Sequence, residues 1–328
     1  MGRPPTRDIL NERDQKDTTV TKLQIPESLH HLIDPDAELE QLAEGFLFSE
    51  GPAWNDVTQE LIFHDIPGDA RWRWTEERGP ELVESPDYMG NGAVFDADGG
   101  LLVCEQVTSS LVRIQPDGAR TIPAFHFGGK YLNSPNDVVV HSDGSIYFTD
   151  PNYGRWPVWV GVERKCDLDF QGVFRVPPGG GPVQLVVDRD EFEQPNGLAF
   201  SPDEKTMYID DRTNLKAFDV AEDGSLVNGR LVADDMGSKD IPGTGNPDGL
   251  KVDELGNVWV TARDGIWIFG PDEKLIDILP TPEVSGNLVW GGPDLRTLFI
   301  TMTTKLVRIE TKVRSARLPS HRPERWAA

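Results

Sequence analysis

Residues 131–156 read YLNSPNDVVVHSDGSIYFTDPNYGRW, and the first half of this stretch is a unit that recurs along the chain. The polar pair Asn136-Asp137 precedes three valines, which favour extended backbone because they are β-branched. The tripeptide Ser-Asp-Gly at 142–144 predicts a turn, and residues 145–149 predict a second strand. The stretch therefore predicts a β-hairpin whose first strand begins at a polar residue.

The same phrase occurs six times, at intervals of 39 to 60 residues. Each copy opens on Asn, Asp or Glu and continues into a mainly apolar strand. Repeats of about 40 to 50 residues that contain several short strands are typical of propeller blades. We therefore predict an all-β fold, a six-bladed β-propeller. The opening residues are Glu50, Asn91, Asn136, Asn196, Asp248 and Asn287.

These six residues would lie on one ring, because equivalent positions of all blades surround the central channel of a propeller. Asn and Asp are unfavourable in strands, so their presence at the same phase of every repeat needs a reason. One interpretation is that each forms a local turn hydrogen bond. The other is that their oxygens converge on a hard divalent cation. The ring as a whole favours the second and predicts a metal site at the central channel.

The repeats define one domain with short tails. We predict a polar N-terminal extension over residues 1–36, a propeller over residues 37–312 and a C-terminal tail over residues 313–328. Residues 37–48 have a strand-like pattern, and the last repeat lacks a fourth strand. Pairing of this N-terminal strand into the last blade would close the ring and remove an open sheet edge. We expect residues 1–22 and the tail to be loosely held.

Charge and composition exclude several classes of partner. The 328-residue chain has 55 acidic and 32 basic residues, which gives a formal net charge of -23. Nucleic acid and anionic membranes would repel such a protein, so we expect neither as a partner. The chain lacks an 18-residue apolar run and a secretion signal, and we expect a cytoplasmic location. Cys104 and Cys166 lie in different repeats without the neighbours that a zinc site needs, and nothing predicts an oligomeric state.

An insertion of about 20 residues, 151–170, interrupts the third repeat between its second and third strands. It contains Tyr153, Trp156 and Trp159. Insertions of this length in compact domains are commonly lids or binding loops. The alternative is a surface excursion whose aromatic side chains cover the blade. Both interpretations remain open from the sequence.

The repeats resemble the SMP-30/gluconolactonase/luciferin-regenerating-enzyme family, and are most similar to its gluconolactonase branch. The resemblance extends over about residues 46–312, in order and in every blade. It rests on SEGPAW (49–54), GNGAVFDADGGLLVCEQ (90–106), LNSPNDVVVHSDGSIYFTDPNYG (132–154), QPNGLAFSPDEKTMYIDD (194–211), PDGLKVDELGNVWVTARDGIW (247–267) and NLVWGGPDLRTLFIT (287–301).

The resemblance implies one divalent cation at the mouth of the channel, usually calcium. It implies four metal ligands, namely Glu50, Asn136, Asn196 and Asp248. It also implies that Asp248 is the general base and that Asn91 lies on the substrate side, whereas Asn287 is interpreted as a strand cap. Further candidate substrate contacts are Ser134, Glu105 and Tyr153, which lie close to the ring or at strand ends.

The chemistry of this ligand set agrees with calcium. Two carboxylates and two amide oxygens are hard ligands that neutralise a dication and leave positions for substrate. Zinc is disfavoured without sulfur or clustered imidazole, although Mn²⁺, Mg²⁺ and Zn²⁺ stay as alternatives. Such a cation can polarise an ester carbonyl, with a carboxylate helping to deliver water. A carboxylate bound to a dication is a weak base, so delivery by Asp248 and by a metal-bound water both stay open.

The sequence thus predicts a metal-dependent lactonase, a hydrolase of carboxylic esters that acts on a gluconolactone-like sugar lactone or a related small lactone. The alternatives are a calcium-dependent phosphotriesterase or other esterase, and a propeller that binds a ligand without catalysis. A serine nucleophile is disfavoured because no G-x-S-x-G motif occurs. Three departures from the family leave the exact substrate open, namely residues 89–92, the aromatic loop 156–159 and the pair Asp210-Asp211.

Overall fold

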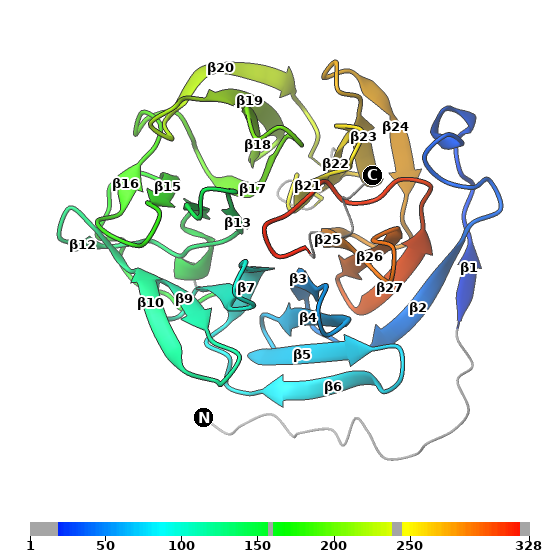
Figure 1. Ribbon diagram of the computed structural model, residues 1–328, viewed down its shortest axis with the longest axis horizontal. Helices are drawn as coiled ribbons and strands as arrows, with labels where there is room; N and C mark the ends of the chain where they lie inside the picture. Colours follow the sequence, from blue (N-terminus) through cyan, green and yellow to red (C-terminus); the bar gives the residue numbers. More distant parts are fainter. Residues whose placement is uncertain (1–18, 157–159, 238–244, 322–328) are drawn as a thin grey trace.

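The computed structural model describes residues 19–156, 160–237 and 245–321. Most of its strands form six sheets arranged radially about one axis, as Figure 1 shows, and a further two strands form a separate hairpin. The innermost strand of each sheet contacts the innermost strands of both neighbouring sheets, so these six strands close a ring. The predicted all-β, six-bladed propeller is therefore confirmed.

Five blades are four-stranded antiparallel sheets, in which the strands follow one another from the channel outward. Blade one contains β3 (Ser49–Asn55), β4 (Glu60–Asp65), β5 (Ala70–Thr75) and β6 (Gly79–Glu84). Blade two contains β7 (Gly90–Phe95), β8 (Leu101–Glu105), β9 (Ser110–Ile114) and β10 (Arg120–Ala124). Blade three contains β13 (Val138–Val140), β14 (Ile146–Asp150), β15 (Gly172–Val176) and β16 (Gln184–Leu185).

The second half of the ring continues in the same way. Blade four contains β17 (Pro195–Phe200), β18 (Thr206–Asp211), β19 (Asn214–Val220) and β20 (Leu226–Ala233). Blade five contains β21 (Leu250–Val252), β22 (Val258–Ala262), β23 (Gly265–Phe269) and β24 (Leu275–Pro280). The remaining short elements are the hairpin β11 (His126–Phe127) and β12 (Lys130–Tyr131), and the 3-10 turns η1 (Glu27–Leu29) and η2 (Tyr153–Arg155).

The sixth blade joins the two ends of the chain. Its strands β25 (Ser285–Gly291), β26 (Thr297–Met302) and β27 (Lys305–Glu310) are completed by β2 (Glu38–Glu44), which pairs with β27. Glu40 lies opposite Arg308 in this register, and the two side chains form an ion pair at 2.6 Å. A fifth strand, β1 (Val20–Lys22), pairs with β2. The N-terminal strand therefore closes the ring, as the sequence predicted.

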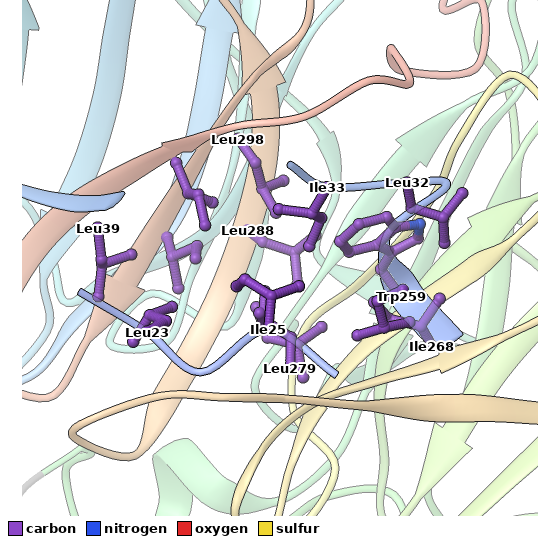
Figure 2. Packing of buried hydrophobic residues seen from close by; sticks show 14 of the residues in the cluster. Leu23, Ile25, Leu32, Ile33, Leu39, Trp259, Ile268, Leu279, Leu288 and Leu298 are labelled. Atoms are coloured by element: carbon purple, nitrogen blue, oxygen red, sulfur yellow. The ribbon is translucent and has the colours of Figure 1, made fainter. Parts of the chain in front are cut away.

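The N-terminal segment also contributes to the core, which the sequence did not predict. Leu29, Leu32 and Ile33, within the expected polar extension, are fully buried. They pack with Leu23 and Ile25 against side chains of blades five and six, including Trp259, as Figure 2 shows. Residues 23–33 of the predicted N-terminal extension therefore pack against the propeller, because their scattered apolar side chains fill the space between two blades. Residues 1–18 lie outside the described residues.

The start of the C-terminal tail is also ordered against the propeller, contrary to expectation. Val313, Ala316 and His321 are buried, and the amide of Ala316 donates to the carbonyl of Val252 at 3.0 Å. This segment, red in Figure 1, crosses the centre of the ring. Residues 315–321 cover an apolar cavity of about 60 Å³ inside the channel. Residues 322–328 of the predicted tail lie outside the described residues. Within the described residues, no helix is long and apolar enough to cross a membrane.

Candidate metal centre and catalytic cavity

In four blades the polar residue that opens the repeat lies where the inner strand departs from regular pairing, and in blades three and five Asn136 and Asp248 precede the inner strand. Register shifts occur between Glu50 and Ala53 in β3, and between Pro195 and Leu198 in β17. Equivalent shifts occur in β7 and β25. A bulge redirects a side chain from the regular alternation of a strand. The irregularity therefore allows the polar side chain at this position to point toward the channel mouth.

A glycine follows the polar residue in four blades and lets the neighbouring blade approach. A Cβ atom on Gly51 would lie 1.8 Å from the carbonyl oxygen of Asn91, and one on Gly197 would lie 2.3 Å from that of Asp248. Such distances exclude any side chain, so glycine is needed for close contact. The four residues are Gly51, Gly92, Gly197 and Gly249. Blade three differs, because Asp137 follows Asn136.

Six of the eight predicted site residues line one cavity of about 360 Å³ at the channel mouth. They are Glu50, Asn91, Asn136, Tyr153, Asn196 and Asp248. The wall also contains the polar residues Gln106 and Asn246, which the sequence did not single out, and the apolar residues Phe48, Ile66, Val160 and Val284. The four proposed ligands therefore open onto one space that is large enough for a small organic molecule.

Ser134 and Glu105, the other two predicted substrate contacts, are not part of this wall. The Ser134 hydroxyl donates to the carbonyl of Pro151 at 2.7 Å and accepts from the amide of Gly154 at 3.0 Å. The Glu105 carboxylate binds Arg120 and accepts from the Thr108 hydroxyl at 2.9 Å. Both side chains are buried and hold local structure. Their positions give no support to direct substrate contact.

The carboxylates at the channel mouth repel one another in a buried environment. Burial raises the pKa of Glu50 well above its usual value, and the nearby Asp248 raises it further. Burial raises the pKa of Asp248 to about 7, against a hydrogen bond from Asn196 that lowers it. Such a pair is stabilised by protons or by a bound cation. The site is therefore built to receive positive charge.

The donor set fits a hard divalent cation. One oxygen of Glu50 accepts from the amide of Gly51, whereas the buried Oε1 has no hydrogen-bond partner within the described residues. Among all the residues that the structure describes, no three His, Cys, Asp or Glu side chains converge as a metal-binding group. The ring instead combines two carboxylates with two amides. This combination favours an oxygen-ligated cation over zinc.

Asp210 is a further acidic residue next to this site. It is fully buried at the end of β18, and one of its oxygens accepts from the amide of Gly197 at 2.9 Å. Burial raises its pKa well above the usual value, and repulsion from Asp248 adds to the effect. Its other oxygen has no hydrogen-bond partner within the described residues. The sequence feature that could have identified Asp210 as part of this site is the acidic pair Asp210-Asp211 at a strand end.

Two arginines tie the described residues of the insertion, 151–156 and 160–170, to neighbouring segments of the chain. The buried Arg155 guanidinium donates to the carbonyls of Leu132 and Asn133. Arg164 reaches blade two, where it donates to the carbonyl of Gln106 at 3.0 Å and to the Ser109 hydroxyl at 2.9 Å. Tyr153 and Val160 from this loop line the cavity wall. Trp159 lies outside the described residues.

Burial and the nearby Asp210 and Asp248 carboxylates raise the pKa of Tyr153. Its hydroxyl therefore stays protonated at physiological pH and can donate a hydrogen bond. The Tyr153 ring also contacts that of Trp156 in an edge-to-face arrangement, with centroids 5.4 Å apart. These contacts favour the lid or binding-loop interpretation of the insertion.

Comparison with known proteins places these features in a family. Residues 48–304 match the sequence model of the SMP-30/Gluconolactonase/LRE-like region. The chain is 29% identical to a gluconolactonase from Zymomonas mobilis over 306 residues, which cover 87% of this chain and 84% of the relative. It is 35% identical to a 6-deoxy-6-sulfogluconolactonase from Pseudomonas putida, over 78% of this chain and 83% of the relative.

A solved structure described as a gluconolactonase from Xanthomonas campestris has the same fold. The TM-score is 0.78 at 32% sequence identity, and the match covers 90% of this chain and 95% of that structure. The sequence match spans most of the propeller, including the residues that line the cavity. The chain therefore belongs to the SMP-30/gluconolactonase/LRE-like family.

Proposed function

We propose that this protein is a divalent-cation-dependent lactonase that hydrolyses a sugar lactone or a related small lactone. The observation that carries the proposal is the convergence of Glu50, Asn136, Asn196 and Asp248 on one cavity. The names of the relatives support the reaction type, since two of them are lactonases of gluconic acid derivatives. The expected cytoplasmic location stays a prediction.

Glu50, Asn136, Asn196 and Asp248 would hold the cation, with calcium as the first choice and Mn²⁺, Mg²⁺ and Zn²⁺ as alternatives. When bound, a divalent cation supplies a Lewis acid that polarises the lactone carbonyl. The two carboxylates would balance its charge, and this relieves the repulsion between Glu50 and Asp248 described above.

Asp248 is proposed as the general base. It accepts a proton from the attacking water as the water oxygen bonds to the acyl carbon. The bond between that carbon and the ring oxygen then breaks, and the proton is returned to the departing oxygen. One water is consumed, and the product is an open-chain hydroxy acid. Transfer by a positioned carboxylate of this kind is ordinary general acid–base catalysis.

The cavity wall supports a small, partly polar substrate. Asn91, Gln106 and Asn246 offer amide groups to hydroxyls, and Tyr153 offers a hydrogen-bond donor. The buried Oε1 of Gln106 has no hydrogen-bond partner within the described residues. Phe48, Ile66 and Val284 would contact less polar parts of the substrate.

The test is lactone hydrolysis, followed by proton release, with the parent protein and the variants Glu50→Gln and Asp248→Asn. Cation content is measured on the same samples. Both variants are expected to lose at least about a hundredfold in activity, the order of effect of one positioned acid–base group. Glu44→Gln, an exposed change on β2, serves as the control. Parental activity and parental cation content in both variants would overturn the assignment.

A further inference from the structure

Lys251 lies beneath the proposed cation site, inside the channel. It is the middle residue of β21, and its side chain forms part of the wall of the small apolar cavity that residues 315–321 cover. Its ammonium donates to the carbonyl of Leu250 at 3.0 Å and to the side-chain oxygen of Asn287 at 3.2 Å. It also faces Oδ2 of Asp137 at 3.6 Å. The aliphatic stem of Lys251 thus lies beside an apolar cavity, and its ammonium group lies among polar groups.

Asp137 is the acidic partner of this lysine. It occupies the position where four other blades have glycine, and it is almost fully buried. One oxygen, Oδ1, accepts from the amide of Val138 at 2.8 Å. The other, Oδ2, has no hydrogen-bond partner within the described residues and faces the ammonium of Lys251. An ionised carboxylate that is buried and has one oxygen without a hydrogen bond is stabilised by a nearby positive charge.

Both partners of Lys251 are connected to the proposed cation ligands. The Asn287 side chain lies against Gly249, which follows the proposed ligand Asp248, because a Cβ atom on Gly249 would stand 2.2 Å from its oxygen. That oxygen also accepts from the amide of Leu288 at 2.9 Å. The Asp137 carboxylate repels those of Glu50 and Asp248, which places all three in one electrostatic group. Asp137 also follows the proposed ligand Asn136 directly in sequence. Asn287 therefore does more than cap its strand, since its side chain binds Lys251 and lies against the residue that follows Asp248.

We propose that Lys251 is a positioning residue that acts as a permanent cation under the metal centre and sets the affinity of the centre for divalent cations. The inference rests on the cation site of the proposed function. Lys251 and the divalent cation neutralise the same set of channel carboxylates. The lysine holds this set together when no divalent cation is bound, and it repels the divalent cation when one binds.

Two single variants are predicted to change cation affinity in opposite directions. Lys251→Met removes a positive charge and leaves the Asp137 carboxylate free to attract the divalent cation, so affinity rises. Asp137→Asn removes a negative charge and leaves the ammonium unbalanced, so affinity falls. The double variant removes both charges, and its affinity returns close to that of the parent protein. This pattern is the signature of a charge pair coupled to a third charge.

The experiment titrates CaCl₂ into the full-length, chelator-treated protein by calorimetry at one fixed pH of 8.5 for the parent and all variants. Each single variant is expected to change the calcium dissociation constant roughly tenfold, which corresponds to about 1.4 kcal/mol. Melting temperatures are measured on the same samples. Lys251→Met is expected to melt lower than the parent without calcium and to gain more in Tm when calcium is added.

Lys216→Met is the matched control. The side chain of Lys216 has the same 18% exposure as that of Lys251, and its ammonium pairs with Asp211 and Glu191 on blade four. It makes no contact with Asn287 or Asp137 among the interactions of the described residues. Loss of Lys216 is therefore expected to lower Tm with and without calcium equally, and to leave calcium affinity unchanged.

The outcomes separate this inference from the proposed function. If the parent binds calcium and all three variants bind it with the parental affinity, the proposed role of Lys251 is overturned, whereas the cation site is not. If the parent binds neither calcium nor Mn²⁺, the latter titrated in the same way as MnCl₂, the cation site is overturned as well. If Lys251→Met does not fold, Asp137→Asn and the double variant still decide. Weaker calcium binding by Asp137→Asn, together with parental calcium binding by the double variant, supports the inference. Any other order of affinities contradicts it.

Discussion

Gly197 lies directly against Asp248 of the next blade. A Cβ atom on Gly197 would stand 2.3 Å from the Asp248 carbonyl oxygen and 2.7 Å from a carboxylate oxygen of Asp210. The missing side chain of one blade thus sets the position of an acidic residue on its neighbour. The arrangement recurs between Gly51 and Asn91, so the glycine that follows the polar residue in four blades helps to define the ring.

Gly197→Ala is therefore expected to displace Asp248. Overpacking of this kind costs about 1 to 3 kcal/mol of folding free energy. We expect lactonase activity to fall at least about tenfold, since ångström-scale displacement of a catalytic group has effects of that order or larger. The measurements are the free energy of unfolding in urea and the kcat with a lactone substrate. Gly270→Ala, where the nearest atom is a side-chain oxygen at 3.0 Å, is the control. Equal effects of the two changes would contradict the account.

The stability of the metal-free protein is expected to fall as pH rises. The pKa of Asp248 is raised to about 7, and that of Glu50 is also raised, so the folded state binds these protons more tightly than the unfolded state. The stabilising contribution of the Asp248 proton is complete below about pH 4, near the pKa of an unfolded carboxyl, and is lost as pH passes about 7. The contribution of Glu50 has the same sign, because its pKa is raised as well.

Thermal melting of chelator-treated protein between pH 5 and 8.5 checks this expectation, with each pH point also measured in calcium. Calcium should reverse the trend, because cation binding favours the ionised carboxylates. Asp248→Asn should flatten the metal-free profile. A parent profile that is flat without calcium would show that these carboxylates are not held as described.

Loss of Arg164 is expected to weaken substrate binding more than chemistry. Arg164 ties the insertion to blade two through Gln106 and Ser109, and the insertion supplies Tyr153 to the cavity wall. Arg164→Ala should raise KM several-fold and lower kcat less, in steady-state kinetics with a lactone. Arg189→Ala tests specificity, since Arg189 pairs with Asp169 of the same insertion at an exposed position. Exposed pairs contribute little, so this control should behave like the parent.

The N-terminal segment is expected to be essential for stability. Leu32 is fully buried between blades five and six, and Leu32→Ala should cost about 2 to 5 kcal/mol of unfolding free energy. Leu47→Ala removes the same atoms from a side chain that is 58% exposed, and should change stability by less than about 0.5 kcal/mol. Urea unfolding measures both. A small effect at Leu32 would mean that the segment is not part of the core.

The sequence predicted the blades well because each blade repeats a local pattern. Polar residue, strand, glycine turn and second strand are short-range features, and their recurrence indicates the ring. The closure by β2 was also predictable, since the last repeat lacked a strand and the N-terminal region supplied one. The position of Asn136 and Asn196 on the cavity wall follows from the same phase.

Long-range contacts explain what the sequence did not reveal. Arg155 and Arg164 donate to backbone carbonyls, which every residue has, so the sequence does not identify these partners. Leu29 and Ile33 lie in a polar segment without the alternation of a strand, so their burial depends on blades five and six. Ser134 was a reasonable candidate by proximity, but its hydroxyl is used by the backbone of the insertion.

The measurement that tests the central claim most directly is lactone hydrolysis by the metal-stripped protein, followed with a pH indicator. The panel contains an aldonolactone, an aromatic lactone and a phosphotriester, and Ca²⁺, Mn²⁺, Mg²⁺ or Zn²⁺ is added back singly. We predict no turnover after stripping and recovery on an aldonolactone with calcium. Undiminished lactone hydrolysis without any cation, or no lactone turnover with every cation, would contradict the proposal.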